Sequence, residues 1–321
     1  MRRAGGRDPL AGELALAAFA HLAVSVGFAS WWSRVTFDQP RFGDQYHQGI
    51  YRYRLIGTGA VEGVADLVGN PLGERLGPDQ AGELFTGLVA VNGVSFLIFV
   101  VLSGALLSQA GIGGARRTVL QLLTIALVAL SSFVVTPYDD LALVWMAAVV
   151  LAARAGRPWD LLAPALVVVG VATRETALLG AAVLVATVLA GERAGRAARM
   201  AWSTLGAGCA AYVGLRLVLG GAFQVRQGVS IDENLTTPVR WMGLTLAVLL
   251  VVAWVALTSD LTGGPSPSSG RRWLYILSLP YVVLVAATAG WFEVRVLVPI
   301  LLADLWVRLP LNGGDRSVRD A

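Results

Sequence analysis

The sequence predicts an all-α protein that crosses a membrane with about ten helices. Three observations predict this fold class. Hydrophobic residues make up 56% of the 321-residue chain, more than a soluble domain of this length could bury. Apolar segments recur from one end of the chain to the other. Charged residues make up only 14% of the chain and gather between those segments.

Each apolar segment is expected to form one membrane-spanning helix. The first, at 14–30, follows three arginines and ends at Trp31-Trp32, an aromatic pair typical of a membrane–water interface. A signal peptide is the alternative, but the small-residue cleavage signal is indistinct, which favours an anchor. The other segments are 84–107, 118–136, 138–153, 161–173, 176–190, 200–220, 240–258, 273–290 and 296–308. Those at 138–153 and 161–173 are short for a hydrocarbon core of about 30 Å, so tilt or flanking residues would have to extend them.

The arginines orient the chain in the membrane. All 25 basic residues are arginine. With both termini in the cytoplasm, fifteen arginines lie on the inner side and nine on the outer side, as the positive-inside rule requires. The acidic residues are distributed the other way, eight inside and thirteen outside. Acidic residues contribute little to topology, so those on the outer side need another explanation.

Composition also limits the location and partners of the protein. The absence of lysine, with abundant Ala, Gly and Val, suggests a GC-rich bacterial genome, and hence the bacterial inner membrane. The pI of 9.6 is explained by topology, so it does not indicate a nucleic-acid partner. A single cysteine, Cys209, excludes an intramolecular disulfide, and two histidines with one cysteine cannot form a typical zinc site.

One transmembrane domain is expected over residues 1–321, with its largest outer loop at 33–83. The loop opens with a polar stretch, 38–54, that is rich in acids, arginines and tyrosines. If 45–56 is helical, Asp44, His47 and Arg52 share one side, and Tyr46 and Tyr53 share the other. This pattern predicts a short amphipathic helix at the membrane surface. The alternative is a solvated loop with an aromatic belt. A second interfacial helix is expected around 61–68.

Three further outer connections carry reactive groups. They contain Tyr138, Asp139 and Asp140; Arg174 and Glu175; and Glu293 and Arg295. A charge in so short a connection is costly unless it faces a watery cavity or a partner. One interpretation is a shared site at the outer face, and the other is a set of salt bridges that tie the spans together. For Asp140 we expect helix N-capping.

For the charged residues within the spans we expect structural roles. Asp304 and Arg308 are spaced as an i, i+4 ion pair at the inner end of the last span. Arg216 lies within a span, and we expect its long side chain to extend toward the outer surface.

The outer-face pattern resembles the GT-C superfamily of integral-membrane glycosyltransferases. Members have a first span, then a large outer loop with Asp-Glu or Asp-Asp followed by Tyr; here the match is Asp44-Gln45-Tyr46, without the second acid. The segments Thr173–Thr176 and Glu293–Pro299 also look like stretches that recur in bacterial members. The similarity covers most of the chain in layout but only about a dozen residues in detail, and the soluble C-terminal domain of larger members is missing.

The resemblance implies transfer of a sugar from a polyprenyl-phosphate carrier to a glycan, lipid or protein acceptor. Asp44 would be the general base, with Asp38 as the substitute candidate. Arginines would hold the phosphate, acids would orient them or bind sugar hydroxyls, and tyrosines would line the sugar site. The expected substrate-binding residues are His47, Tyr51, Arg52, Arg54, Tyr138, Asp139, Arg174, Glu175, Glu293 and Arg295. No cofactor is required, although Asp139 and Asp140 could bind a divalent metal with other acids.

Three other functions are compatible with the sequence. An O-antigen-type polymerase or ligase would also use outer arginines and lipid-linked sugars. A lipid or anion transporter or flippase would place ionisable residues near mid-membrane, often in repeated halves. Neither an internal repeat nor such a mid-span acid is evident, which favours an enzyme. An inactive scaffold is the remaining alternative.

Overall fold

Each of the ten predicted apolar segments overlaps a helix of the structure. The computed structural model describes residues 9–27, 42–48, 51–69, 82–132, 136–191, 194–219, 231–262, 268–288 and 294–310. These residues form helices and turns without a β-strand, so the all-α prediction is confirmed for them.

The helices differ in type and length. One is a short π-helix, η1 (Gly43–Gln48). Three are 3-10 turns, η2 (Trp159–Leu162), η3 (Glu175–Ala177) and η5 (Val294–Val296). The α-helices are α1 (Pro9–Gly27), α4 (Leu55–Val68), α6 (Glu83–Gln109), α7 (Gly114–Ser131), α8 (Asp139–Ala155), α9 (Ala163–Thr173), α10 (Leu178–Leu189), α11 (Gly195–Val218), α12 (Ile231–Thr236), α13 (Pro238–Thr262), α14 (Ser268–Thr288) and α15 (Val298–Arg308).

Long apolar helices mark the chain as a membrane protein. By length and composition, four described helices could cross a bilayer: α1, α6, α7 and α13. The helical stretches 159–173 and 175–189 are apolar but shorter. Each of them begins with a 3-10 turn, which lengthens the helix because the 3-10 form rises further per residue than the α-helix.

Helices α10 and α15 lie at the centre of the bundle. All residues from Leu179 to Thr187 are buried, and in α15 every residue except Ile300 is buried. Helix α10 contacts α8, α11, α14 and α15. A helix that is apolar on all sides requires such neighbours around it. Helices α13 and α14 instead expose many large apolar side chains, as expected for a surface in contact with lipid.

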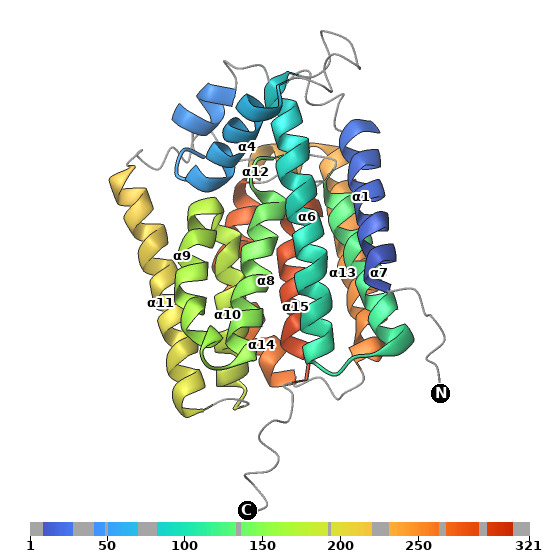
Figure 1. Ribbon diagram of the computed structural model, residues 1–321, viewed down its shortest axis with the longest axis vertical. Coiled ribbons are helices and arrows are strands. Elements are labelled where there is room, and N and C mark those ends of the chain that lie inside the picture. Colours follow the sequence, from blue (N-terminus) through green and yellow to red (C-terminus); the bar gives the residue numbers. More distant parts are fainter. Residues whose placement is uncertain are drawn as a thin grey trace, which may run out of the picture.

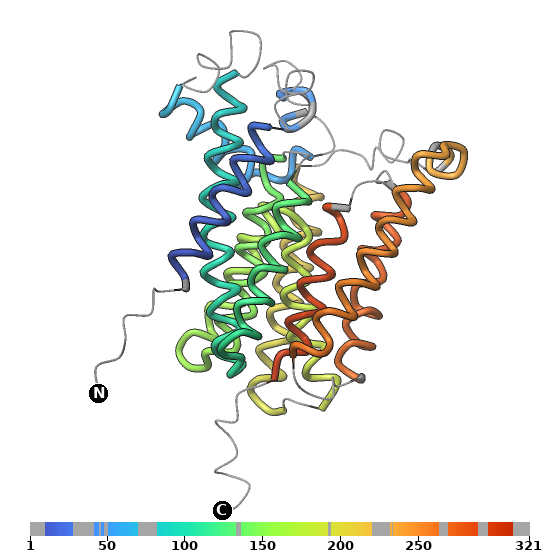
Figure 2. Tube along the Cα trace, turned by 90° about the vertical axis from the view of Figure 1, so that its right-hand side faces the viewer, coloured from blue at the N-terminus to red at the C-terminus, as the bar shows by residue number. Residues whose placement is uncertain are grey.

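The elements of the first loop gather at one end of the bundle, which we call the first-loop end. Figure 1 shows η1 and α4 there, above the long helices. Helix α1 begins, and α15 ends, at the opposite end (Figures 1 and 2). Along one edge, α13 and α14 lean away from the other helices toward the first-loop end (Figure 2).

The expected single helix over 45–56 is wrong. η1 ends at Gln48, and the chain turns at 51–53 before α4 begins. The Arg54 N–H donates to the Tyr51 carbonyl at 2.9 Å and closes this turn. The predicted sidedness holds in part: Tyr46 and Tyr53 are buried and Asp44 and His47 are exposed, whereas Arg52 is half-buried. The turn aims Tyr53 and Arg54 at Glu175, a distant partner that the local pattern could not reveal.

The second amphipathic helix is confirmed as α4, but its apolar face meets protein rather than lipid. Val61 and Ala65 are buried, and α4 packs along α6. A Cβ at Gly57 would lie 2.7 Å from the Pro137 carbonyl oxygen and from the Cβ of Tyr138. Glycine at position 57 therefore allows α4 to lie directly against the connection before α8.

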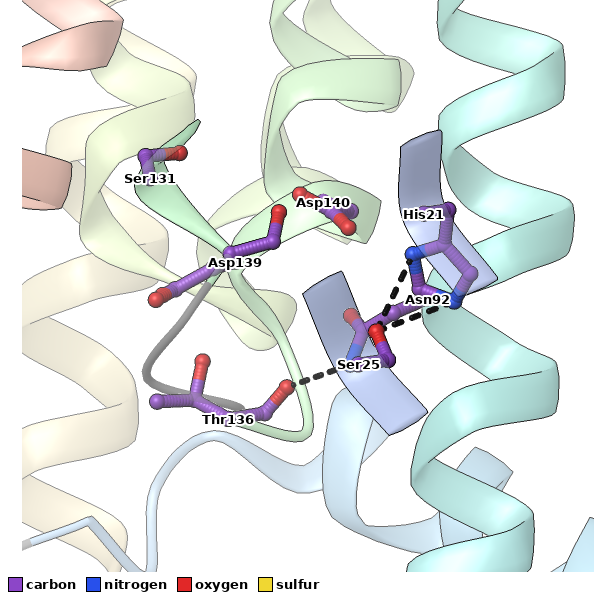
Figure 3. Close-up of a pocket in the computed structure, with 8 residues that line it drawn as sticks. His21, Ser25, Asn92, Ser131, Thr136, Asp139 and Asp140 are labelled. Carbon is purple, nitrogen blue, oxygen red and sulfur yellow. Dashed lines mark hydrogen bonds between the residues drawn. The ribbon is translucent and has the colours of Figure 1, made fainter. Parts of the chain in front are cut away.

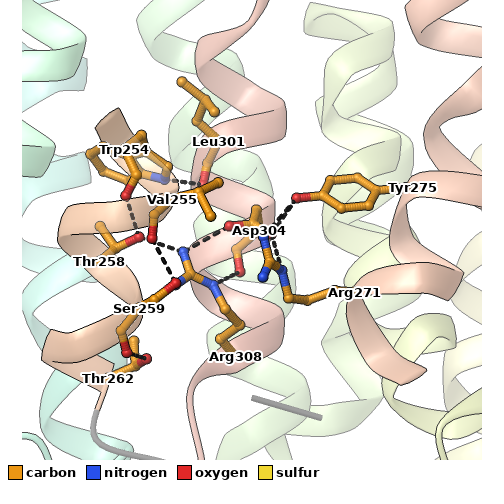
Figure 4. A network of polar contacts seen from close by, with 10 residues as sticks. All are labelled: Trp254, Val255, Thr258, Ser259, Thr262, Arg271, Tyr275, Leu301, Asp304 and Arg308. Atoms are coloured by element: carbon orange, nitrogen blue, oxygen red, sulfur yellow. Dashed lines mark hydrogen bonds and ion pairs between the residues drawn. The ribbon is translucent and has the colours of Figure 1, made fainter. Parts of the chain in front are cut away.

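At the opposite end, a buried ion-pair network joins α13, α14 and α15 (Figure 4). Arg308 contacts Asp304 at 2.7 Å, which confirms the predicted i, i+4 pair. Asp304 also accepts from Arg271 at 2.9 Å and from the Tyr275 hydroxyl at 2.7 Å. Arg308 donates further to Thr258 Oγ1 at 2.6 Å. The predicted pair is thus part of a larger polar network that connects three helices.

Candidate functional site at the first-loop end

Arg54 and Glu175 form a two-point ion pair between the first loop and the connection from α9 to α10. Arg54 Nη2 lies 2.5 Å from Glu175 Oε1, and Arg54 Nε lies 3.2 Å from Oε2. Both side chains are largely buried, 6% and 12% exposed. Burial alone would raise the pKa of Glu175, but the charges of Arg54 and Arg174 outweigh it and lower this pKa to about 2. Glu175 is therefore ionised at neutral pH.

Asp139 forms ion pairs with two arginines from distant parts of the chain. Arg174, next to Glu175, contacts Asp139 Oδ1. Arg295, in η5, donates to Asp139 Oδ2 at 2.8 Å. Arg174 has extended backbone between α9 and η3, so the chain reverses there while the side chain reaches α8. The structure thus brings together predicted residues from three separate connections.

Tyrosine rings surround these cations. The guanidinium carbon of Arg54 lies 4.3 Å from the ring centroid of Tyr138 and 4.6 Å from that of Tyr51. Arg174 lies 5.4 Å from the Tyr138 ring. Cations over aromatic faces gain stabilisation that grows when water is excluded. Burial also raises the pKa of Tyr53, so its hydroxyl stays protonated and donates to Glu175 Oε2 at 3.3 Å.

Arg216 belongs to the same cluster, although the sequence indicated only a side chain extending toward the surface. Its guanidinium carbon lies 3.6 Å from the ring centroid of Tyr53 and 5.2 Å from that of Tyr212. The signal that could have identified it is its position near the C-terminal end of a span, one helical turn after a tyrosine.

Positive charge exceeds negative charge in the described part of this cluster. Four guanidiniums lie there with two carboxylates; the members are Arg54, Arg174, Arg216, Arg295, Asp139 and Glu175. In addition, the buried Nε of Arg174 and the buried Nη2 of Arg52 have no hydrogen-bond partner among the described residues. Buried N–H groups are almost always paired. The arrangement is therefore chemically suited to an anion with several acceptor oxygens.

Asp44 and His47 lie on the exposed side of η1. His47 Nε2 lies 2.6 Å from Glu62 Oε1 of α4. Both groups line an open cavity of about 400 Å³, whose other lining residues are Phe42, Gly43, Ala65, Asp66, Glu83 and Leu84. Ring contacts link this cavity to the arginines, from Phe42 to Tyr46 at 4.7 Å and from Tyr46 to Tyr138 at 6.0 Å. Among the described residues, Asp44 itself makes no contact with the arginines of the cluster.

Two predicted residues lie outside the part of the chain that the structure describes, and a third has another position than expected. Asp38 and Glu293 lie outside the described residues. The expected N-capping by Asp140 is wrong, because Tyr138 occupies the cap position of α8 and no side-chain cap hydrogen bond forms. Asp140 instead lies in the first helical turn, buried to 4% exposure. No group of three or more His, Cys, Asp or Glu side chains suited to a metal occurs in the described ranges.

Comparisons with family models, with curated proteins and with solved structures find nothing that matches the chain. The resemblance to the GT-C superfamily therefore stays a prediction, supported by the residues quoted for it.

Proposed function

We propose that the chain is a GT-C-type membrane glycosyltransferase with about ten membrane crossings. It would move a sugar from a polyprenyl-phosphate carrier to an acceptor at the extracytoplasmic face of a bacterial cell membrane. The observation that supports the proposal is the convergence of Arg54, Arg174 and Arg295 at the first-loop end, where the buried Nε of Arg174 has no hydrogen-bond partner among the described residues. A lipid-linked phosphate would supply an acceptor for it.

In this proposal, Arg174 and Arg295 bind the phosphate of the donor. Their shared contact with Asp139 holds both guanidiniums in one place. Arg54 is held by both oxygens of Glu175 and by the tyrosine rings, so its role is to position the site. Positioned guanidiniums stabilise the charge that develops on a leaving phosphate oxygen.

The transfer itself follows from these roles. Asp44, or Asp38 as the substitute, takes the proton from the acceptor hydroxyl. The acceptor oxygen then bonds to the anomeric carbon of the sugar while the bond from that carbon to the phosphate oxygen breaks. The bonding electrons leave with polyprenyl phosphate, whose added charge the arginines stabilise. Tyr46, Tyr51 and Tyr138 would line the sugar, and the prenyl chain would lie in an apolar groove between the spans.

The competing interpretation is that these ion pairs only tie the helices together. It gives no reason for the buried Nε of Arg174, which has no hydrogen-bond partner among the described residues. A bound anionic substrate would provide one.

The test is a transfer assay with purified protein and a labelled polyprenyl-phosphate sugar. Removing the general base should lower the rate by about 10²- to 10⁴-fold, so Asp44→Asn and Asp38→Asn are assayed in parallel. The variant that loses activity identifies the base. Because Asp44 is exposed, Asp44→Asn should keep the thermal stability of the parent protein. Absence of transfer to every acceptor offered, or full activity in both variants, would disprove the proposal.

A further inference from the structure

A second polar site has Asp139 in its lining, together with residues of α1 and α6. It is a small, partly open cavity between α1, α6, the end of α7, the connection at 136–138 and the start of α8 (Figure 3). Its lining residues are His21, Ser25, Asn92, Ser131, Ser132, Thr136, Asp139 and Asp140. The space open to the centre of a water-sized sphere is about 20 Å³, and about 10–15 Å³ suffices for one water. The cavity therefore admits a single small species.

Asp140 is the acid of this cavity that no described arginine contacts. Its side chain is 4% exposed, and it forms no ion pair with a described arginine. Asp139, its neighbour, is by contrast neutralised by Arg174 and Arg295. A carboxylate buried without a counter-charge is costly at membrane depth. A cation in the cavity would remove that cost.

The lining presents oxygen acceptors, and several of its hydrogen-bond donors are used elsewhere. The Asn92 side-chain N–H donates to the Thr136 carbonyl at 2.8 Å. The hydroxyls of Ser131 and Ser132 both donate to the Val128 carbonyl, at 2.7 and 2.9 Å. Their oxygen lone pairs remain available. The Asn92 Oδ1 and Thr136 Oγ1 atoms are buried without a partner among the described residues.

His21 is bound through one ring nitrogen to the chain of α6. Its Nε2 lies 2.9 Å from the Val89 carbonyl oxygen, so Nε2 carries a proton and donates it there. The Ser25 hydroxyl oxygen lies 3.5 Å from both ring nitrogens. With Nδ1 unprotonated the ring is neutral and adds no positive charge to the cavity.

We propose that this cavity binds one monovalent metal cation of the size of sodium, held by Asp140, Asn92 Oδ1, Thr136 Oγ1 and the neighbouring serine oxygens. Hard cations select oxygen ligands of these kinds. One carboxylate matches one positive charge, whereas a divalent ion would leave a buried excess. A water has only two hydrogens to offer to this set of acceptors and would leave the charge of Asp140 unbalanced. The cation would tie α1, α6 and α7 to the start of α8, where Asp139 positions Arg174 and Arg295.

The experiment compares the melting temperature of the purified full-length protein in detergent with sodium chloride and with choline chloride at equal ionic strength. Choline is too large for the cavity. Sodium should raise the Tm with the logarithm of its concentration, by roughly 5–10 °C at a concentration about a hundredfold above its Kd. Asp140→Asn should abolish the rise. Asp66→Asn, which removes an exposed acid of the first-loop end, should keep it in full.

A second variant keeps the test decisive if Asp140→Asn does not fold. Thr136→Val removes Oγ1 but retains the carbonyl that accepts from Asn92, and it should shift the sodium dependence to at least tenfold higher concentration. Equal Tm in sodium and choline would overturn the proposal, as would an unchanged sodium response in Asp140→Asn or in Thr136→Val. The readout does not involve sugar transfer, so its result is independent of the proposed enzymatic activity.

Discussion

Arg54 and Glu175 are 121 residues apart in the sequence, yet they meet through two hydrogen bonds, of 2.5 and 3.2 Å. This pair joins the turn after η1 to the connection between α9 and α10. Glu175 directly follows Arg174 in the sequence. The pair therefore links the first loop to the residues that we propose bind phosphate. The first three predictions examine this end of the molecule.

Removing the charge of Glu175 should destabilise the protein. Glu175→Gln leaves Arg54 buried without its counter-charge, and breaking a buried pair in this way costs about 3–5 kcal/mol. Thermal unfolding in detergent would measure the loss. Asp160→Asn breaks a comparable but more exposed pair with Arg196, whose side chain is 32% exposed, and should cost less. Equal losses of stability in the two variants would contradict the prediction that the more buried pair contributes more.

The Glu175 contribution should also depend on pH in a defined range. Its pKa falls from an ordinary 4.5 to about 2 in the folded protein, so folding favours the ionised form. The stabilisation is therefore complete above about pH 4.5 and is lost as the pH falls from there toward 2. The difference in Tm between the parent and Glu175→Gln should be constant from pH 5 to pH 7, and shrink below that range. A difference that already changes between pH 7 and pH 5 would contradict this assignment.

Arg174 should affect donor binding through its geometry as well as its charge. Arg174→Lys keeps the positive charge but loses the planar fork that matches phosphate oxygens. Since hydrogen bonds to charged groups contribute about 1.5–3 kcal/mol, affinity for a polyprenyl-phosphate sugar should fall about 10- to 100-fold. Arg196→Lys, in an ion pair outside the cluster, serves as the matched control. Equal affinity in both variants would show that Arg174 does not bind the phosphate.

Two glycines of α4 offer a matched test of close packing. A Cβ at Gly57 would overlap the Pro137 carbonyl and Tyr138, whereas a Cβ at Gly63 would meet nothing within 4 Å. Gly57→Ala should cost about 1–3 kcal/mol and weaken donor binding by shifting Tyr138. Gly63→Ala should instead stabilise α4 by about 0.5–1 kcal/mol, because alanine favours the helix. Thermal unfolding distinguishes the two, and the same sign of effect would contradict the predicted contact.

The ion-pair network at the opposite end should matter for stability alone. Asp304→Asn leaves Arg271 and Arg308 without their common counter-charge, and the expected loss is about 3–5 kcal/mol. Donor affinity of the folded fraction should remain unchanged, because the network lies at the other end of the bundle. Asp260→Asn, at an exposed position of α13, should change neither quantity. A specific loss of donor affinity in Asp304→Asn would show that the two ends are coupled.

Much of the secondary structure, and the residues of the candidate site, could be predicted from the sequence. Apolar runs predict helices because a backbone in lipid must satisfy its own hydrogen bonds. The short connections around Asp139, Arg174 and Arg295 drew attention because charges near a membrane require partners. The turn at 51–53 could not be predicted, since its Arg54 side chain is bound to Glu175, a partner 121 residues away that the local pattern does not reveal.

The sequence by itself determined that the chain is helical and apolar, and that its acids and arginines lie between the apolar segments. Only the tertiary structure decided that Arg174 and Arg295 share Asp139, that Arg216 joins the cluster, and that Asp140 faces a separate polar cavity. The physical reason is that central helices such as α10 are apolar on every side. Their periodicity does not specify which neighbours they contact, so the partners of the charges at their ends depend on how the whole bundle packs.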